Sequence, residues 1–391
     1  MNSTNVRRTH KVARKPIVLL FVVNTPEFFV SHRLPVAEAA KRAGYEVHVA
    51  SAHGGAVEKI EDAGFQHHVI EFARSGQNPL QEMRTLKQLF ILFRSLQPDL
   101  VHLVTIKPVL YGGLVARFTG VSGVVAAVSG LGTVFVANSM VSKLRRWLVT
   151  RLYVQAFKQR RLAVIFQNPI DRETLLSTGA LSIGNTRMIR GSGVAMAEYP
   201  YLPEPAGKPV VVMAARLLKD KGVAEFVNAA NILSERGVDV DMRLIGSADP
   251  GNPGSVTDEE LDSWKKDGQV TLMGYRTDIA YQYASANIVC LPSYYGEGLP
   301  KSLVEAAACG RAVVTTDHPG CRDAIKPDET GVLVPVKDSV ALANAIHKLI
   351  DQPELRKDMG AAGRALAEEC FSIENVVAQH LKIYEEVTAH D

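Results

Sequence analysis

The sequence predicts an α/β fold of two Rossmann-like, doubly wound domains that face each other across a central cleft. A chain of 391 residues is longer than one hydrophobic core usually organises. Short, continuously apolar runs alternate with amphipathic stretches, as expected for parallel strands covered by helices on both faces. The alternation stops at a Pro-rich stretch, residues 196–209, and then restarts. These observations indicate two similar domains joined by a linker.

The first half of the chain contains the elements of one doubly wound domain. Residues 1–15 are polar and basic, and we expect a disordered tail there. The N-terminal domain should span residues 16–195 and begin with the strand IVLLFVV. A helix from Ser31 to Ala43, ended by Gly44, should lead to the strand YEVHVA. Further elements are expected at VEKIEDAG (helix), FQHHVIEF, DLVHLVT, GVVAAVS and AVIFQN (strands), and from Leu80 to Gln97 (helix).

The second half repeats the pattern after the linker at residues 196–209. We expect a C-terminal Rossmann-like domain over residues 210–370, with a helix from about Glu225 to Arg236. Residues 371–391 should form an amphipathic helix from Ile373 to Val387 that is able to cross back to the N-terminal domain. The expected strands are PVVVMAA, DMRLIG, VTLMG, NIVCLP, AVVTT and GVLVPV.

Charge is distributed unevenly between the halves. The net charge is +3, but residues 1–195 carry 25 Lys and Arg against 11 Asp and Glu, and residues 196–391 carry 19 against 30. The basic half therefore suits an anionic partner. Four cysteines without a CxxC pair favour a reducing cytosol, and no apolar run reaches the ~18 residues of a membrane span. No signal-peptide pattern precedes the first strand.

Two motifs in the second half carry the chemistry. Glu297 and Glu305 bracket the segment EGLPKSLVE, where a strand, a Gly/Pro turn and a helix N-terminus form a cradle for phosphate. Two carboxylates beside it can accept hydrogen bonds from sugar hydroxyls. Upstream, Arg216 and Lys221 leave a strand end and open a helix, where a diphosphate would meet both cations and the helix dipole. A solvated loop is the alternative for that pair alone, and the second motif outweighs it.

With these residues the chain resembles glycosyltransferase family 4, whose members are retaining transferases of GT-B architecture. The resemblance covers about residues 15–390. It implies that Arg216 and Lys221 bind the donor diphosphate, that Glu305 holds the ribose and that Glu297 contacts the donor sugar. Catalysis would then depend on Glu297, Arg216 and Lys221, without a metal or other cofactor. It also implies that the remaining donor-site residues are Tyr275, Arg276, Gly298, Leu299, Pro300, Ser302 and Leu303.

Shorter stretches resemble one bacterial subgroup, which extends polyprenyl-diphosphate-linked sugars. They include NTPEFFVSHRLPVA, HLVTIKP, VSGLGTVF and FQNPID. The subgroup implies a UDP-N-acetylhexosamine donor (UDP-GalNAc or UDP-GlcNAc) and a lipid-linked sugar acceptor in glycan, O-antigen or capsule assembly. It also implies a cytoplasmic enzyme, peripheral on the inner face of the bacterial cytoplasmic membrane.

The acceptor side departs from the family pattern. The loop that begins at Asn24 has no glycine pair, and Ser129 and Gly130 stand where many members carry a histidine. Asn24, Glu27, Ser129 and Gly130 are the acceptor-side candidates. His32 and His102 are better interpreted as structural residues, since a lone histidine near a strand end is usually satisfied within the core.

Residues 141–162 place basic side chains among Leu and aromatic residues, which suits either an anionic membrane surface or an ordinary domain helix. The acid-free span between Asp99 and Asp171 favours the membrane. Nucleic acid is not expected, because no binding motif accompanies the positive charge.

Three alternatives to a lipid-acceptor transferase stay open. They are a non-hydrolysing sugar-nucleotide epimerase of the same architecture, a transferase with a soluble acceptor, and a binding protein with a relic site. Intact Arg216, Lys221, Glu297 and Glu305 argue against the relic. The Asp239–Asp241 DxD pattern precedes a strand and is better interpreted as loop charge than as a metal site.

Overall fold

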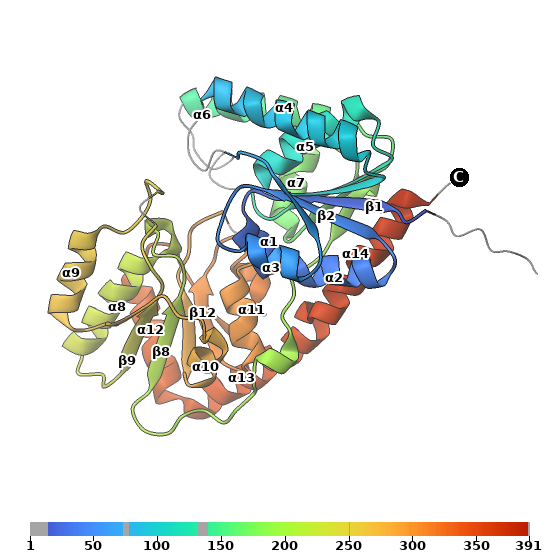
Figure 1. Ribbon diagram of the computed structural model, residues 1–391. Helices are drawn as coiled ribbons and strands as arrows, with labels where there is room; N and C mark the ends of the chain where they lie inside the picture. The colour runs from blue at the N-terminus through green and yellow to red at the C-terminus, as the bar shows by residue number, and fades with distance from the viewer. Residues whose placement is uncertain (1–14, 73–77, 132–139, 250, 297, 390–391) are drawn as a thin grey trace, which may run out of the picture.

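The computed structural model describes residues 15–72, 78–131, 140–249, 251–296 and 298–389. Two parallel sheets, each covered by helices, form two domains stacked one above the other in the view of Figure 1. The expected basic tail falls almost entirely outside the described residues, as does Glu297.

The first sheet has seven strands in the order β3-β2-β1-β4-β5-β6-β7, all parallel. Its central strands are buried along their whole length, which explains their continuous apolar character. Sequence analysis missed β7, because three polar or half-buried residues give no apolar run. The strands are β1 Val18–Val22, β2 Glu46–Ser51, β3 Gln66–Val69, β4 Leu100–Val104, β5 Gly123–Val128, β6 Leu162–Phe166 and β7 Thr186–Met188.

The helix predicted from Ser31 to Ala43 is confirmed over Leu34–Arg42, but its start was wrong, because a separate helix ends at His32. Helix α1 begins at Pro26, where the Thr25 side chain accepts a hydrogen bond from the amide of Phe28 at 3.3 Å. The helix breaks at Arg33, and α2 begins with Pro35 in its first turn. Proline has no N–H, so it cannot bond the carbonyl four residues earlier, that of Ser31. The N-terminal helices are α1 Pro26–His32, α2 Leu34–Arg42, α3 Val57–Asp62, α4 Pro79–Leu96, α5 Ile106–Thr119, α6 Met140–Ala156 and α7 Pro169–Ser177.

The second sheet has six parallel strands in the order β10-β9-β8-β11-β12-β13. Its strands are β8 Val210–Ala214, β9 Asp241–Ile245, β10 Thr271–Gly274, β11 Ile288–Leu291, β12 Ala312–Thr316 and β13 Gly331–Val334. Its helices are α8 Val223–Glu235, α9 Asp258–Asp267, α10 Ile279–Ala284, α11 Lys301–Ala308, α12 Ser339–Asp351 and α13 Pro353–Leu366.

The last helix, α14 (Ile373–Thr388), leaves the C-terminal domain and packs on the first sheet against α2 and β5 (Figure 1). Its Tyr384 hydroxyl lies 2.6 Å from Nδ1 of His102, a fully buried residue of β4. Where the chain crosses back, Val194 pairs with Ser372 in a parallel bridge. The two segments that connect the domains, around Val194 and around Ser372, therefore run side by side.

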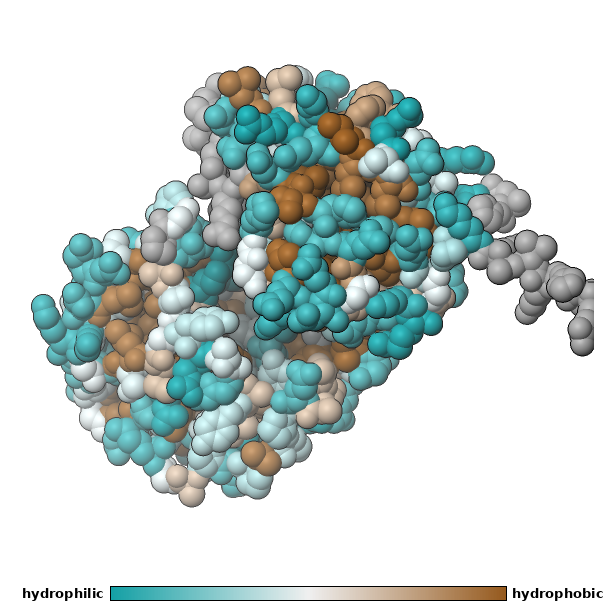
Figure 2. Space-filling view, viewed as in Figure 1, coloured by the Kyte–Doolittle hydropathy of each residue, from teal (hydrophilic) through white to brown (hydrophobic). Residues whose placement is uncertain are grey.

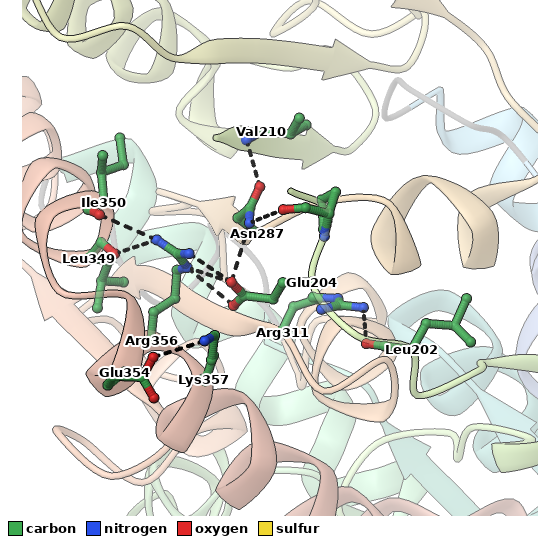
Figure 3. A network of polar contacts seen from close by, with 11 residues as sticks. Leu202, Glu204, Val210, Asn287, Arg311, Leu349, Ile350, Glu354, Arg356 and Lys357 are labelled. Carbon is green, nitrogen blue, oxygen red and sulfur yellow. Dashed lines mark hydrogen bonds and ion pairs between the residues drawn. The ribbon is translucent and has the colours of Figure 1, made fainter. Parts of the chain in front are cut away.

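The Pro-rich linker is held on the C-terminal domain by a buried ion pair (Figure 3). Arg356 of α13 donates to both carboxylate oxygens of Glu204, with the shortest distance 2.7 Å. Asn287 donates to the same carboxylate at 3.2 Å, and Arg311 donates to the carbonyl of Leu202 at 2.7 Å. Residues 202–205 therefore move with the C-terminal domain, because a buried bidentate pair is costly to break.

Candidate active site

The predicted cations lie where β8 ends, at the carboxyl edge of the second sheet. Arg216 is exposed and its guanidinium lies 3.4 Å from the carboxylate of Asp249. Lys221 ends a short 3-10 helix, Lys219–Lys221, and its ammonium lies 5.1 Å from the ring centroid of Tyr295. The next residue, Gly222, has φ 80° and lies directly against the carbonyl of Pro292. A side chain there would collide with that backbone, so glycine brings the start of α8 against the end of β11.

Hydrogen bonds join this loop to the loop after β11. The carbonyl of Asp220 accepts from the amide of Tyr294 at 2.9 Å and from the hydroxyl of Ser293 at 3.3 Å. The β11 loop continues to Gly298, Leu299 and Pro300, all buried, and then to α11. The structure therefore brings the Lys221 loop and residues 298–305 to one edge, as the parallel sheet requires.

Glu305 lies in the second turn of α11 and is 8% exposed. Its Oε1 accepts a hydrogen bond from the Tyr199 hydroxyl at 2.5 Å, and the Lys301 ammonium lies 3.4 Å from the same oxygen. Burial raises the pKa of the Glu305 carboxyl, while Lys301 and Tyr199 oppose that change. Tyr199 was missed in sequence analysis, because it lies about a hundred residues upstream, in the linker region.

The other predicted donor residues are placed as follows. Tyr275 is exposed beyond β10, and Arg276 makes an ion pair with Asp278 at 2.6 Å. Ser302 is half-buried in the first turn of α11, and Leu303 is fully buried in the core. Leu303 can therefore contribute only its backbone to a ligand.

The turn at Gly298–Pro300, which we call the donor turn, contacts the N-terminal domain across the interface. Gln167 and Asn168 directly follow β6, and their side chains bond the backbone of Leu299 and Gly298. Lys301 donates to the carbonyl of Ser31 at 3.3 Å. That carbonyl is available because Pro35 supplies no amide to it. The carboxyl edges of the two sheets therefore face each other.

The acceptor-side candidates lie at the carboxyl edge of the first sheet. Asn24 follows β1, Ser129 follows β5, and Thr105 follows β4, which lies between those two strands. The side-chain oxygens of all three are buried without a hydrogen-bond partner among the described residues. Gly130 has φ 103°, and Glu27 is exposed on α1.

Thr105, at the same sheet edge, was not singled out in sequence analysis. It has φ 74° and ψ 170°, a strained conformation for a β-branched residue. Strain of this kind clusters at functional sites. Composition gives no signal for it, since backbone dihedrals appear only in the structure.

His102 has the structural role expected, bonded to Tyr384 inside the core. His32 stacks on Phe28 at 4.1 Å, and burial lowers its pKa to about 3. Within the described residues there is no group of three or more His, Cys, Asp or Glu side chains able to hold a metal ion.

Comparisons with known proteins agree with this geometry. Residues 200–366 match the model of the "Glycosyl transferases group 1" family, and residues 18–168 match that of "Glycosyl transferase 4-like" proteins. The chain is 30% identical over 369 residues to the N,N'-diacetylbacillosaminyl-diphospho-undecaprenol α-1,3-N-acetylgalactosaminyltransferase of Campylobacter jejuni, covering 91% of this chain and 95% of that protein. It is 24% identical to the capsular polysaccharide glycosyltransferase CapM of Staphylococcus aureus, covering 86% and 88% of the two chains.

Solved structures show the same fold. HepE from Anabaena in complex with UDP-glucose superposes with a TM-score of 0.75 at 18% identity, covering 94% of this chain and 99% of that one. Sucrose-phosphate synthase from Thermosynechococcus elongatus gives 0.78 at 20% identity, covering 95% and 99%. These matches confirm the predicted GT-B fold of two Rossmann-like domains.

Proposed function

We propose a donor and an acceptor for this chain, which belongs to the group 1 glycosyltransferases and is therefore a glycosyltransferase. The donor is a UDP-N-acetylhexosamine, and the acceptor is a saccharide on a polyprenyl diphosphate. The observation that carries the proposal lies at the carboxyl edge of the second sheet, where the loop of Arg216 and Lys221 is bonded to the loop that leads to α11 and its buried Glu305. The C. jejuni relative, named for transfer of N-acetylgalactosamine to an undecaprenyl-linked sugar, supports the substrate classes.

In this proposal each donor-side residue has one task. Arg216 and Lys221 bind the diphosphate, and Oε2 of Glu305 accepts a ribose hydroxyl while Oε1 stays bonded to Tyr199. Tyr275 and Arg276 line the base. Glu297 contacts the sugar, a role carried over from the family resemblance.

We further propose that transfer proceeds with retention and without a metal. The bond from the anomeric carbon to the β-phosphate oxygen breaks, and a bond to the acceptor oxygen forms on the same face. The acceptor hydroxyl gives its proton to the departing diphosphate. Arg216 and Lys221 stabilise the negative charge that develops on that diphosphate.

The acceptor binds at the first sheet, in a polar cradle of Asn24, Thr105 and Ser129. Three buried oxygens without partners are rare in a finished core, and a sugar ring can satisfy them. Glu27 and Gly130 border this cradle in the proposal. Thr105→Val, which keeps the shape and removes the hydroxyl, should raise KM for the acceptor and leave KM for the donor unchanged.

The outer helices of the N-terminal domain support a membrane partner. The outward side of α4 exposes Leu80, Met83, Phe90 and Ile91, and apolar side chains interrupt the hydrophilic surface there (Figure 2). Helix α6, on the other side of α5, exposes Leu144, Trp147 and Leu148. Sequence analysis had singled out only the second of these helices.

Basic side chains lie beside these apolar ones. Arg84, Lys87 and Arg94 share the exposed side of α4, and the Arg151 guanidinium lies 5.3 Å from the Trp147 ring. Lys158, Arg160 and Arg161, the last basic residues of the 141–162 segment, lie beyond the end of α6 at Ala156. They line a hollow of about 500 Å³ at the amino edge of the sheet, with Arg117, Lys158, Arg160 and Arg161 among its walls. No helix in the described parts of the chain is long and apolar enough to cross a bilayer.

An apolar face flanked by cations binds the headgroup region of an anionic bilayer. We therefore propose a peripheral position on the inner face of the cytoplasmic membrane. Flotation with phosphatidylglycerol vesicles should recover the protein, and Trp147→Ser with Leu148→Ser should reduce recovery. Ile183→Ser, which removes an exposed apolar side chain elsewhere, serves as the control.

The transferase proposal is tested by UDP release from a panel of UDP-sugars, with and without a polyprenyl-diphosphate-linked N-acetylhexosamine. Release that requires the lipid acceptor supports the proposal, and epimerisation without release would contradict it. Lys221→Ala should abolish release, whereas Lys219→Ala, two positions away and exposed, should not. Near-normal turnover of both Glu297→Gln and Lys221→Ala would refute the site assignment.

A further inference from the structure

The loop after β6 holds one peptide unit of the donor turn from both ends. Oε1 of Gln167 accepts a hydrogen bond from the amide of Leu299 at 3.0 Å. Nδ2 of Asn168 donates to the carbonyl of Gly298 at 3.1 Å. That amide and that carbonyl belong to the same peptide bond, and the bonds come from the opposite domain. Gln167 is 6% exposed and Asn168 is fully buried.

The orientation of the Asn168 side chain is fixed on its own domain. Its Oδ1 accepts from the amide of Asp171 at 2.8 Å, which caps α7. Its Nδ2 also donates to the Asp171 carboxylate at 2.8 Å. Turning the amide over would lose both bonds, so contacts within the N-terminal domain direct Nδ2 at Gly298.

Gly298 is shaped for this contact. A Cβ at that position would lie 2.9 Å from the carbonyl carbon of Ser129 and closer still to Oε1 of Gln167. Backbone from the first sheet therefore fills the place of a side chain. On the other side of the turn, Leu299 packs against Gly191, which has φ 75° and no side chain to interfere.

The held peptide lies between Glu297 and the start of α11 in the sequence, within the segment proposed to bind the donor sugar. We propose that Gln167 and Asn168 are positioning residues that hold the Gly298–Leu299 peptide from the N-terminal domain and thereby set the geometry of the sugar end of the donor site. This rests on the proposed donor site. The nucleotide end depends on Arg216, Lys221 and Glu305, all in the C-terminal domain, and does not use the contacts of Gln167 and Asn168.

The experiment separates nucleotide binding from transfer. Gln167→Met has a similar volume but lacks the oxygen that accepts the hydrogen bond from Leu299. Asn168→Ser keeps an oxygen that can cap α7 but lacks the N–H that donates to Gly298. Each variant should lower kcat by about tenfold or more, since a buried polar group left unpaired is worth a factor of roughly 5 to 150. The Kd for UDP should change by less than about twofold, because the nucleotide contacts remain. A rise in that Kd matching the fall in kcat would overturn the proposal.

Gln159→Met is the matched control. Its side-chain amide also bonds buried backbone, the carbonyls of Gly113 and Ala156 at 2.7 and 2.6 Å, but within the N-terminal domain. It should lower stability without changing kcat of the folded enzyme. An equal loss of kcat in the Gln159 and Gln167 variants would show a merely structural effect and refute the positioning role.

A mutant cycle tests the contact itself. Gly298→Ala should lower kcat by forcing the turn away from Ser129. Adding Gln167→Met to Gly298→Ala should cost little more, because the contact is already broken. If the fall in kcat of the double variant equalled the product of the two single-variant falls, the proposal would be contradicted. Wild-type protein without any transfer activity would instead refute the proposed function, so the two failures are distinguishable.

Discussion

Replacing Asp171 by asparagine should remove a pH-dependent loss of stability from the N-terminal domain. Asp171 is 8% exposed at the start of α7. Burial raises the pKa of its carboxyl to about 6 from an ordinary 3.8, and the charge of Asp323 adds to this effect. Hydrogen bonds from Asn168 and from the backbone of Leu131 oppose it. Tyr153, fully buried, also faces this carboxylate.

The sign follows from proton binding. The native state holds the Asp171 proton more tightly than the unfolded chain, so stability falls as pH rises from about 4 to about 6. A pKa difference of about 2 corresponds to about 3 kcal/mol of lost stability above pH 6. In Asp171→Asn one of the two donors to the carboxylate loses its acceptor, a cost of about 1–3 kcal/mol that does not depend on pH.

Urea unfolding of wild type and variant, compared between pH 4 and pH 7.5, measures the difference. The free energy of unfolding of the variant relative to wild type should rise by up to about 3 kcal/mol across this interval. Glu173→Gln changes an exposed carboxyl on the same helix and should show a flat difference, within about 0.5 kcal/mol. The reasoning would be refuted if the free energy of unfolding of Asp171→Asn relative to wild type stayed constant over this interval, or if it rose as the pH fell.

Three more outcomes are expected. Arg356→Ala should lower the free energy of unfolding in urea by about 3–5 kcal/mol, because Glu204 stays buried without its partner, whereas an Arg356→Met, Glu204→Leu double variant should lose less. Thr105→Gly should raise thermal stability by about 1 kcal/mol as strain at φ 74° is released, and should weaken acceptor binding in steady-state kinetics. Tyr199→Phe should raise KM for the UDP-sugar by about tenfold, since Glu305 loses a bond worth about 1.5 kcal/mol, and an unchanged KM would contradict that role.

Most of the architecture was predictable because parallel strands buried on both faces give continuous apolar runs. The strand endings located Arg216 and Lys221 correctly at the sheet edge, since ligands of such sheets bind at the carboxyl ends. The break at Arg33 was missed because one helix was expected to start at Ser31, whereas α1 begins at Pro26 and α2 begins at Leu34, with Pro35 in its first turn. A proline is tolerated at a helix start and excluded from its interior, so the error in one boundary caused the other.

The sequence by itself determined the fold class and placed Arg216, Lys221 and the start of α11 at the carboxyl edge of the second sheet, because these depend on local pattern and on topology. Only the tertiary structure decided which residues meet across the domains. Gln167 and Leu299 are separated by more than a hundred positions, and their hydrogen bond requires two complete sheets to face each other. The same holds for Tyr199 with Glu305, and for α14 on the first sheet. Periodicity encodes which face of an element is buried, but long-range pairing depends on how whole domains pack.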